Sequence, residues 1–289
     1  MRSRWFLFGR SSQARVGLIL LLLIAVLVLA APLLAPFNPG AIDPTARLLP
    51  PWSQAASAAS PEARAALHVL GTDSVGRDIL SRLIYGGRLS LAVGILAMLL
   101  SAVFGTVVGA VSGYCGGWVD DVTAWLIDVQ LSFPFLLLAI FVLGALGGGT
   151  AAVVLVLALG TWVNYARIVR AQVRSIRQQG YMEAARGTGA GGMRLLCVHV
   201  LPNTVSPVCV VASFSMAQAI LTEAGLSFLG VGLDPSTPSW GTMLNDGRDY
   251  LLTAWWIATV PGIAIGVACL GATLLGEGLR ELLDPRGPV

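Results

Sequence analysis

The 289 residues are 56% hydrophobic and only 11% charged, with a formal net charge of +3. Soluble domains are roughly 45–50% apolar and about 25% charged. This composition excludes an ordinary water-soluble domain and indicates a chain that lies mostly in a lipid bilayer.

Long apolar stretches recur along the chain. A helix needs about 20 residues to cross the hydrocarbon core of a bilayer, and each uncharged stretch is longer than that. The weakly basic His199, in the fourth stretch, is the one interruption. The stretches are Val16–Ile42, Leu89–Val119, Val129–Ala166, Leu195–Thr222 and Tyr250–Gly276. The third is nearly twice the required length and contains the glycine cluster Gly144–Thr150, which suits a turn, so we divide it into two spans.

The sequence therefore predicts an all-α membrane protein with six transmembrane helices. Their expected limits are about 16–36, 87–112, 121–143, 151–169, 205–229 and 254–278. Residues 1–84 carry the N-terminal tail, the first span and a long external loop, and residues 85–289 carry the other five spans. Because the loop at 37–84 is rich in Pro, Ala and Ser, we expect extended or loosely ordered chain there. Gly105 and Gly109 have a spacing that lets helices approach closely.

The first apolar run follows several arginines and could be a signal peptide or a retained span. A signal peptide has an apolar core of only about 7–15 residues, and this run is longer, which favours a span. The chain has 18 positive residues, all arginine. They concentrate before the first span, after the fourth and at the end of the chain: Arg2, Arg4, Arg10 and Arg15, then Arg167, Arg170, Arg174, Arg177, Arg186 and Arg194, then Arg280 and Arg286. By the positive-inside rule, both termini lie in the cytoplasm.

Several kinds of chemistry are disfavoured by residues that the sequence lacks. Without lysine, the chain can form neither a phosphate-binding P-loop nor a lysine Schiff base. Its two histidines, His68 and His199, are too few for a multi-histidine metal site. We therefore expect no metal, cofactor or catalytic site on this chain, and any ATP-driven work must belong to a separate subunit.

The segment at about 170–203 has an unusual pattern. Arginines at helical spacing are followed by a break at Gly180, a short run Tyr181–Arg186, and further glycines from Gly189. This pattern predicts a short amphiphilic helix outside the bilayer. Pro202 disfavours helix in the residue before it, so we expect a turn there.

This segment resembles the cytoplasmic loop of ABC importer permeases, in which Glu-Ala-Ala, a glycine and Leu-Pro occur at fixed spacing. Glu183-Ala184-Ala185, Gly189 and Leu201-Pro202 match it, and His199 stands where the general pattern has an apolar residue. Further matches indicate the C-type subunit of dipeptide and oligopeptide permeases. They are Gly71–Asp78 with Ser81-Arg82 and Gly87–Leu91, Glu223–Gly230 with Pro238–Gly241, and Leu279-Arg280 with Leu283–Arg286.

The resemblance implies a type I ABC importer permease fold and a peptide cargo. The same branch also imports nickel chelates, haem precursors and some oligosaccharides. The partners implied are a homologous B-type permease, two ATPases that bind ATP and Mg²⁺, an extracytoplasmic binding protein and the lipid membrane, with no nucleic acid. The Glu-Ala-Ala helix would dock on the ATPase, unless it is an ordinary solvated loop. The coupling residues implied are Tyr181, Glu183, Ala184, Ala185, Arg186, Gly189, His199, Leu201 and Pro202.

Charged residues near the spans leave two interpretations open. Asp128 and Glu223 could belong to a transport pathway or gate, or could pair internally, because a carboxylate that faces lipid is costly. Asp73, Arg77 and Asp78 could contact the binding protein, or could cap and pair locally to fix the external loop.

Two other classes of function compete with an ABC permease. An ion-coupled secondary transporter should have more ionisable residues in its spans, or an inverted repeat. A membrane anchor without transport activity would leave the Glu-Ala-Ala segment unexplained.

Overall fold

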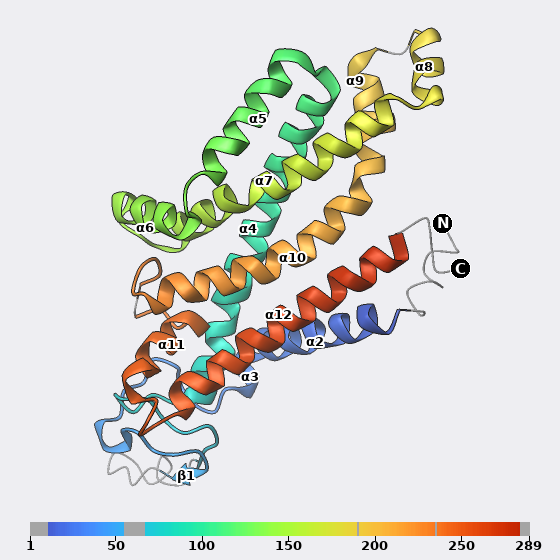
Figure 1. Ribbon diagram of the computed structural model, residues 1–289. Coiled ribbons are helices and arrows are strands. Elements are labelled where there is room, and N and C mark those ends of the chain that lie inside the picture. The colour runs from blue at the N-terminus through green and yellow to red at the C-terminus, as the bar shows by residue number, and fades with distance from the viewer. Residues whose placement is uncertain (1–10, 55–66, 190, 235, 284–289) are drawn as a thin grey trace.

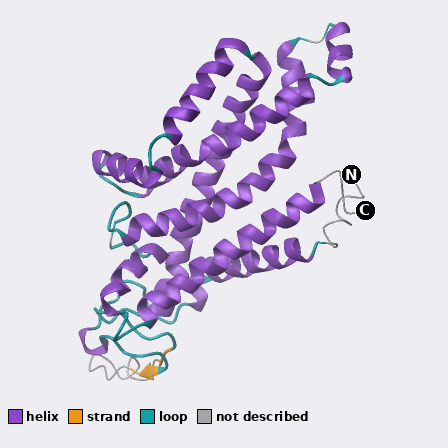
Figure 2. Ribbon diagram, viewed as in Figure 1, coloured by secondary structure: helices purple, strands orange, loops and turns teal. Residues whose placement is uncertain are grey.

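The computed structural model describes residues 11–54, 67–189, 191–234 and 236–283. Arg2, Arg4, Arg10 and Arg286, used above for orientation, lie outside the described residues. Helices make up most of the described chain (Figures 1 and 2). Their bounds are α2 Ser12–Leu29, α3 Ala31–Leu34, α4 Ile79–Cys115, α5 Gly117–Leu131, α6 Phe135–Leu146, α7 Thr150–Arg177, α8 Gly180–Gly187, α9 Gly192–Arg194, α10 Leu201–Phe228, α11 Trp240–Gly247 and α12 Trp256–Leu283. Two short 3₁₀ helices, Pro44–Ala46 and Arg248–Tyr250, a π-helix, Leu195–Val200, and the antiparallel strands β1 Ser53–Gln54 and β2 Leu67–His68 complete the elements.

Within the described residues, five helical segments are long and apolar enough to cross a membrane: α2, α4, α7, α12 and the continuous stretch Gly192–Phe228. The pair α5 and α6 passes the same test together, and counting it as one broken span gives the predicted six. This third span is not the straight helix expected at 121–143, because its halves are bent by 89°. Pro134 caps α6 and disfavours helix at Phe133, which explains the break.

Helix α4 is much longer than the predicted span of 87–112 and crosses the boundary expected at residue 84. Its start is set by Asp78, whose side chain accepts a hydrogen bond from the Ser81 backbone N–H at 2.7 Å. Glycines bring α4 and α7 close together. A Cβ at Gly105 would lie 2.4 Å from the Trp162 carbonyl oxygen, and one at Gly109 would lie 2.5 Å from that of Ala166. The close approach predicted from this glycine spacing is therefore confirmed.

Helices α2 and α12 pack side by side, so the two described ends of the chain lie together (Figure 1). A Cβ at Gly278 would lie 2.4 Å from the backbone nitrogen of Ala14, and the Ser11 hydroxyl donates to Glu281 Oε2 at 2.8 Å. The C-terminal end of α12 also lies near the start of α10 and the end of α7, since Leu283, Asn203 and Gln172 line one cavity. Both described ends therefore lie toward the end of the bundle that carries α8.

The segment that the sequence predicts to be an external loop is more ordered than its composition predicts. The Thr72 hydroxyl donates to the Ala46 carbonyl at 2.5 Å, and the Leu48 N–H donates to the Asp73 carbonyl at 3.0 Å. The Trp256 indole N–H ties this segment to α12 through the Thr72 carbonyl, at 3.1 Å. The expectation of loose chain is thus wrong for the described part, because these tertiary hydrogen bonds hold it; residues 55–66 lie outside the described residues.

The turn expected at Pro202 is also absent. The π-helix Leu195–Val200 runs directly into α10, and the helical stretch continues to Phe228. In an α-helix a proline ring clashes with the carbonyl four residues earlier. The wider π turn before Pro202 places that carbonyl differently and accommodates the ring without a break.

Candidate coupling segment and transport groove

Helix α8 carries the Glu-Ala-Ala sequence and forms the tip of one end of the bundle (Figure 1). Met182 is fully buried in an apolar cluster that includes Val173, Ile176 and Leu195. Glu183 and Ala184 are exposed, and Ala185 is half-buried against the same cluster. The helix is thus fastened by one face and offers the other to solvent.

The end of α8 is formed by local hydrogen bonds and a glycine. The Thr188 N–H donates to the Ala184 carbonyl at 3.1 Å, and the Thr188 hydroxyl donates to the Ala185 carbonyl at 2.9 Å. Gly189 has a φ of 84°, in the left-handed region that favours glycine. The chain therefore leaves α8 through a turn at Thr188 and Gly189.

The other residues of the coupling motif lie at the start of the next long helix. His199 is in the π-helix with its ring 6.3 Å from that of Tyr181, so the structure brings these two together. Leu201 packs against the apolar cluster beneath α8, and Pro202 is exposed. Arg186 belongs to α8, but its side chain lies outside the described parts of the structure.

Asp120, which the sequence analysis did not single out, pairs with two arginines at this end of the bundle. Arg170 Nε lies 2.5 Å from Asp120 Oδ1, Arg174 contacts Asp120 Oδ2, and the Ser112 hydroxyl donates to Oδ1 at 2.8 Å. These contacts join α4, α5 and α7. No spacing in the sequence places Asp120 beside residues 50 positions away.

At the opposite end of the bundle, Asp73 is the centre of an ion-pair network that we call the external cluster, formed by Asp73, Arg77, Arg82 and Asp246. Asp73 is fully buried and lies 2.6 Å from Arg77 Nε and 2.5 Å from Arg82 Nη1. Asp246 Oδ2, in α11, lies 3.0 Å from Arg77 Nη2 and 2.9 Å from Arg82 Nη1. Asp73 also accepts backbone N–H bonds from Val75 and Arg77.

Asp78, in the same region, makes a separate set of contacts. Besides capping α4, its carboxylate lies 2.9 Å from His68 Nδ1, and the ring of His68 stacks on Phe37 at 4.5 Å between centroids. Asp73 pairs with Arg77, and Asp78 caps α4, so these residues cap and pair locally. Contact with a binding protein stays a prediction. Arg82 and Asp246, which complete the network, were missed as site residues by the sequence analysis.

Glu223 and Asp128 have different surroundings. Glu223 is fully buried and accepts hydrogen bonds from Ser227 at 2.8 Å and from Ser90 and Ser239 at 3.3 Å, which link α10 to α4 and to the start of α11. Asp128 is exposed on α5, one turn before the bend, and its carbonyl accepts from Ser132. Glu223 thus forms the internal contacts expected if it pairs within the protein. A gating or pathway role for Glu223 or Asp128 stays a prediction.

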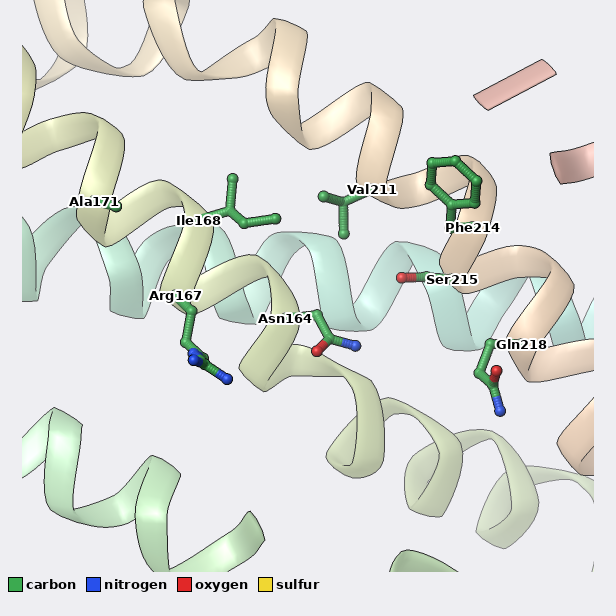
Figure 3. Close-up of a pocket in the computed structure, with 8 residues that line it drawn as sticks. All are labelled: Asn164, Arg167, Ile168, Ala171, Val211, Phe214, Ser215 and Gln218. Carbon is green, nitrogen blue, oxygen red and sulfur yellow. The ribbon is translucent and has the colours of Figure 1, made fainter. Parts of the chain in front are cut away.

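Two adjoining cavities form a groove between α7 and α10 (Figure 3). The first has a volume of about 610 Å³ and is lined by Asn164, Arg167, Ile168, Ala171, Val211, Phe214, Ser215 and Gln218. The second, of about 840 Å³, shares three of these residues and adds Gln172, Asn203, Ser206, Pro207, Val210, Arg280 and Leu283. We call this the α7–α10 groove. Polar residues inside predicted spans, such as Asn164 and Gln218, were the sequence signal for it, and the sequence analysis did not use them.

Comparison with known proteins places the chain in a family. Residues 105–287 match the family described as "binding-protein-dependent transport system inner membrane component", and residues 1–51 match the "N-terminal TM domain of oligopeptide transport permease C". A chain of the inward-facing MetNI methionine ABC transporter shares the fold, with a TM-score of 0.57 and 18% identity over 70% of this chain and 96% of its own length. The importer permease fold predicted from the sequence is thereby confirmed.

Relatives match along nearly the whole chain. The dipeptide transport system permease protein DppC of Haemophilus influenzae is 40% identical over 98% of this chain and 93% of its own length. The di/tripeptide permease DppC of Pseudomonas aeruginosa is 39% identical, over 99% and 92%, and the dipeptide permease DppC of Escherichia coli is 41% identical, over 98% and 92%. The chain belongs to the family of binding-protein-dependent transport system inner membrane components, as a C-type permease subunit.

Proposed function

We propose that this chain is the C-type permease of an importer that carries short peptides across the inner membrane. The observation that carries this proposal is identity of about 40% along nearly the full length of relatives named for dipeptides or di/tripeptides. The α7–α10 groove supports it, because its volumes fall within the roughly 300–1,000 Å³ of small-molecule sites.

The chain would work with four kinds of partner. A homologous B-type permease would cover the groove, two ATPases would bind ATP and Mg²⁺ and hydrolyse the nucleotide, and an extracytoplasmic binding protein would deliver the peptide. The lipid bilayer would surround the apolar faces of the spans. Catalysis would belong to the ATPases and none of it to this chain.

We assign α8 as the helix that docks on an ATPase. Met182 fastens one face of α8 to the cluster beneath α7 and the π-helix, and the opposite face carries Glu183 and Ala184 into solvent. Movement of an ATPase against α8 would therefore act on α7 and α10, the two helices that line the groove. This assignment places α8, and with it both termini, on the cytoplasmic side, in agreement with the arginine distribution.

The test uses the complete complex in proteoliposomes with its binding protein outside. We expect ATP-dependent uptake of labelled di- and tripeptides, with nickel chelates, a haem precursor and an oligosaccharide as control cargoes. Uptake of a control cargo with no uptake of peptides would refute the peptide assignment. Purification of a stable homodimer without ATPases would refute the importer assignment.

A further inference from the structure

We propose that Arg167 binds a carboxylate of the passing cargo in the α7–α10 groove, with the amides of Asn164 and Gln218 beside it to contact the peptide backbone. This inference rests on the proposed function, since it names where a peptide touches this subunit. Figure 3 shows the side chains of Arg167, Asn164 and Gln218 turned to the same side of the two helices.

Arg167 differs from the arginines that follow it on α7. Arg170 and Arg174 pair with Asp120, and Arg177 lies over the Tyr114 ring, 5.7 Å from its centroid. Within the described part of the chain, no carboxylate forms an ion pair with Arg167. Arg167 is exposed at the groove, so its guanidinium can bind an anionic group brought from outside the chain.

The chemistry of the groove agrees with a peptide. Among the residues that line the two cavities, none is Asp or Glu, whereas Arg167 and Arg280 are both cationic. The amides of Asn164 and Gln218 can both donate and accept hydrogen bonds, as a peptide backbone requires. Ile168, Val211 and Phe214, which line both cavities, offer apolar contact that does not distinguish among side chains.

The position of Arg167 along the span predicts when the carboxylate is bound. Arg167 lies roughly 25 Å along α7 from Thr150, toward the end that carries α8. If that end is cytoplasmic, Arg167 contacts the cargo carboxylate near the end of import. A single partly solvated arginine binds weakly, which suits a step in which the cargo must leave again.

The experiment compares cargo charge within each variant of the complete complex. Initial uptake rates of Ala-Ala-Ala, which carries a C-terminal carboxylate, and of its C-terminal amide, which carries none, are measured in proteoliposomes with saturating binding protein, and their ratio is divided by the wild-type ratio. Because the same binding protein delivers both peptides in every variant, its own preference cancels. The variants are Arg167→Gln, Arg167→Glu and Arg167→Lys. The matched controls are Arg15→Gln and Arg15→Glu, at an exposed arginine on α2 that lines neither cavity.

We expect the ratio to fall about threefold in Arg167→Gln, as for loss of a solvent-exposed ion pair, and about tenfold in Arg167→Glu, where repulsion is added. Arg167→Lys and both Arg15 variants should stay close to the wild-type ratio. An unchanged ratio in Arg167→Glu would overturn the inference, because Arg167 would then serve a lipid phosphate or an acidic residue of the second permease. Loss of the second permease on purification of Arg167→Gln would overturn it in the same way. If the wild-type complex carries no peptide at all, the proposed function fails first, and this inference fails with it.

Discussion

The external cluster and α8, at opposite ends of the bundle, are held in different ways. In the external cluster, Asp73 and Arg82 are almost fully buried and form an ion pair, and Asp246 ties them to α11. At the other end, α8 keeps its charged Glu183 in solvent and is fastened mainly by Met182. The first region is held by ion pairs within one chain, whereas the second exposes one face to solvent. The difference indicates that the external cluster braces its end of the bundle, and it supports the proposal that α8 docks on another protein.

The largest effect should come from breaking the brace. Asp73→Ala leaves the buried guanidinium of Arg82 without its main carboxylate, which costs about 3–5 kcal/mol for a buried pair. We expect a clear drop in the thermal unfolding midpoint of the detergent-purified complex. Asp249→Ala, at an exposed ion pair with Arg248, is the control and should change stability by less than about 0.5 kcal/mol. Equal midpoints for both variants would show that the external cluster is not a brace.

The attachment of α8 can be broken at Met182. Met182→Ala removes its buried anchor, a loss of about 2 kcal/mol or more. An eight-residue helix is marginal without tertiary packing, so the loss should appear as local opening of α8. Amide hydrogen exchange over residues 180–188 should accelerate at least about tenfold while the external segment keeps its protection. Met193→Ala, at an exposed methionine, should change neither region, and protection of α8 in Met182→Ala would contradict the single-anchor account.

A pair of glycines tests the turn after α8. Gly189 has a φ of 84°, so Gly189→Ala should cost about 1–2 kcal/mol locally and turn the chain away from its path. Gly191 has a φ of −67° and open space around it, so Gly191→Ala should be tolerated. We expect peptide-stimulated ATPase activity of the reconstituted complex to fall in the first variant alone. Equal activity in both would mean that the turn does not position α8.

Glu183→Ala should have the smallest effect on stability and a large effect on coupling to the ATPases. Glu183→Ala changes an exposed side chain, so unfolding should shift by less than about 0.5 kcal/mol. Association with the ATPases and peptide uptake should nevertheless fall, with membrane insertion intact. Ser175→Ala, at an exposed residue of α7, is the control. Unchanged peptide-stimulated ATPase activity in Glu183→Ala would remove α8 from the coupling mechanism.

Much of the fold could be predicted because a bilayer imposes length and apolarity on each span. The short helix after Gly180 could also be predicted, since glycines bound it on both sides. The bend at Pro134 was not predicted although the proline is visible, because the uncharged run continues through it and was read as one span. The π-helix before Pro202 was missed because proline rules describe ordinary α-helix.

The site residues that sequence reasoning missed share one physical cause. Asp246 meets Arg82 across 164 residues, and Asp120 meets Arg170 across 50, so no local spacing predicts either contact. The groove has the same origin, because it forms only where α7 and α10 come together, with Arg167 on one helix and Gln218 on the other. The order of the external segment likewise comes from tertiary hydrogen bonds to residues such as Thr72, while its composition resembles that of loose chain.

The helical stretch from Gly192 to Phe228 runs from beside α8 to α11. Near its far end lies Glu223, whose carboxyl group accepts hydrogen bonds from three serines. At 1.5 Å per residue, a helical stretch of this length is about 55 Å long. Because the π-helix Leu195–Val200 and Pro207 both lie in the half near α8, this half can bend while the serine contacts of Glu223 stay in place.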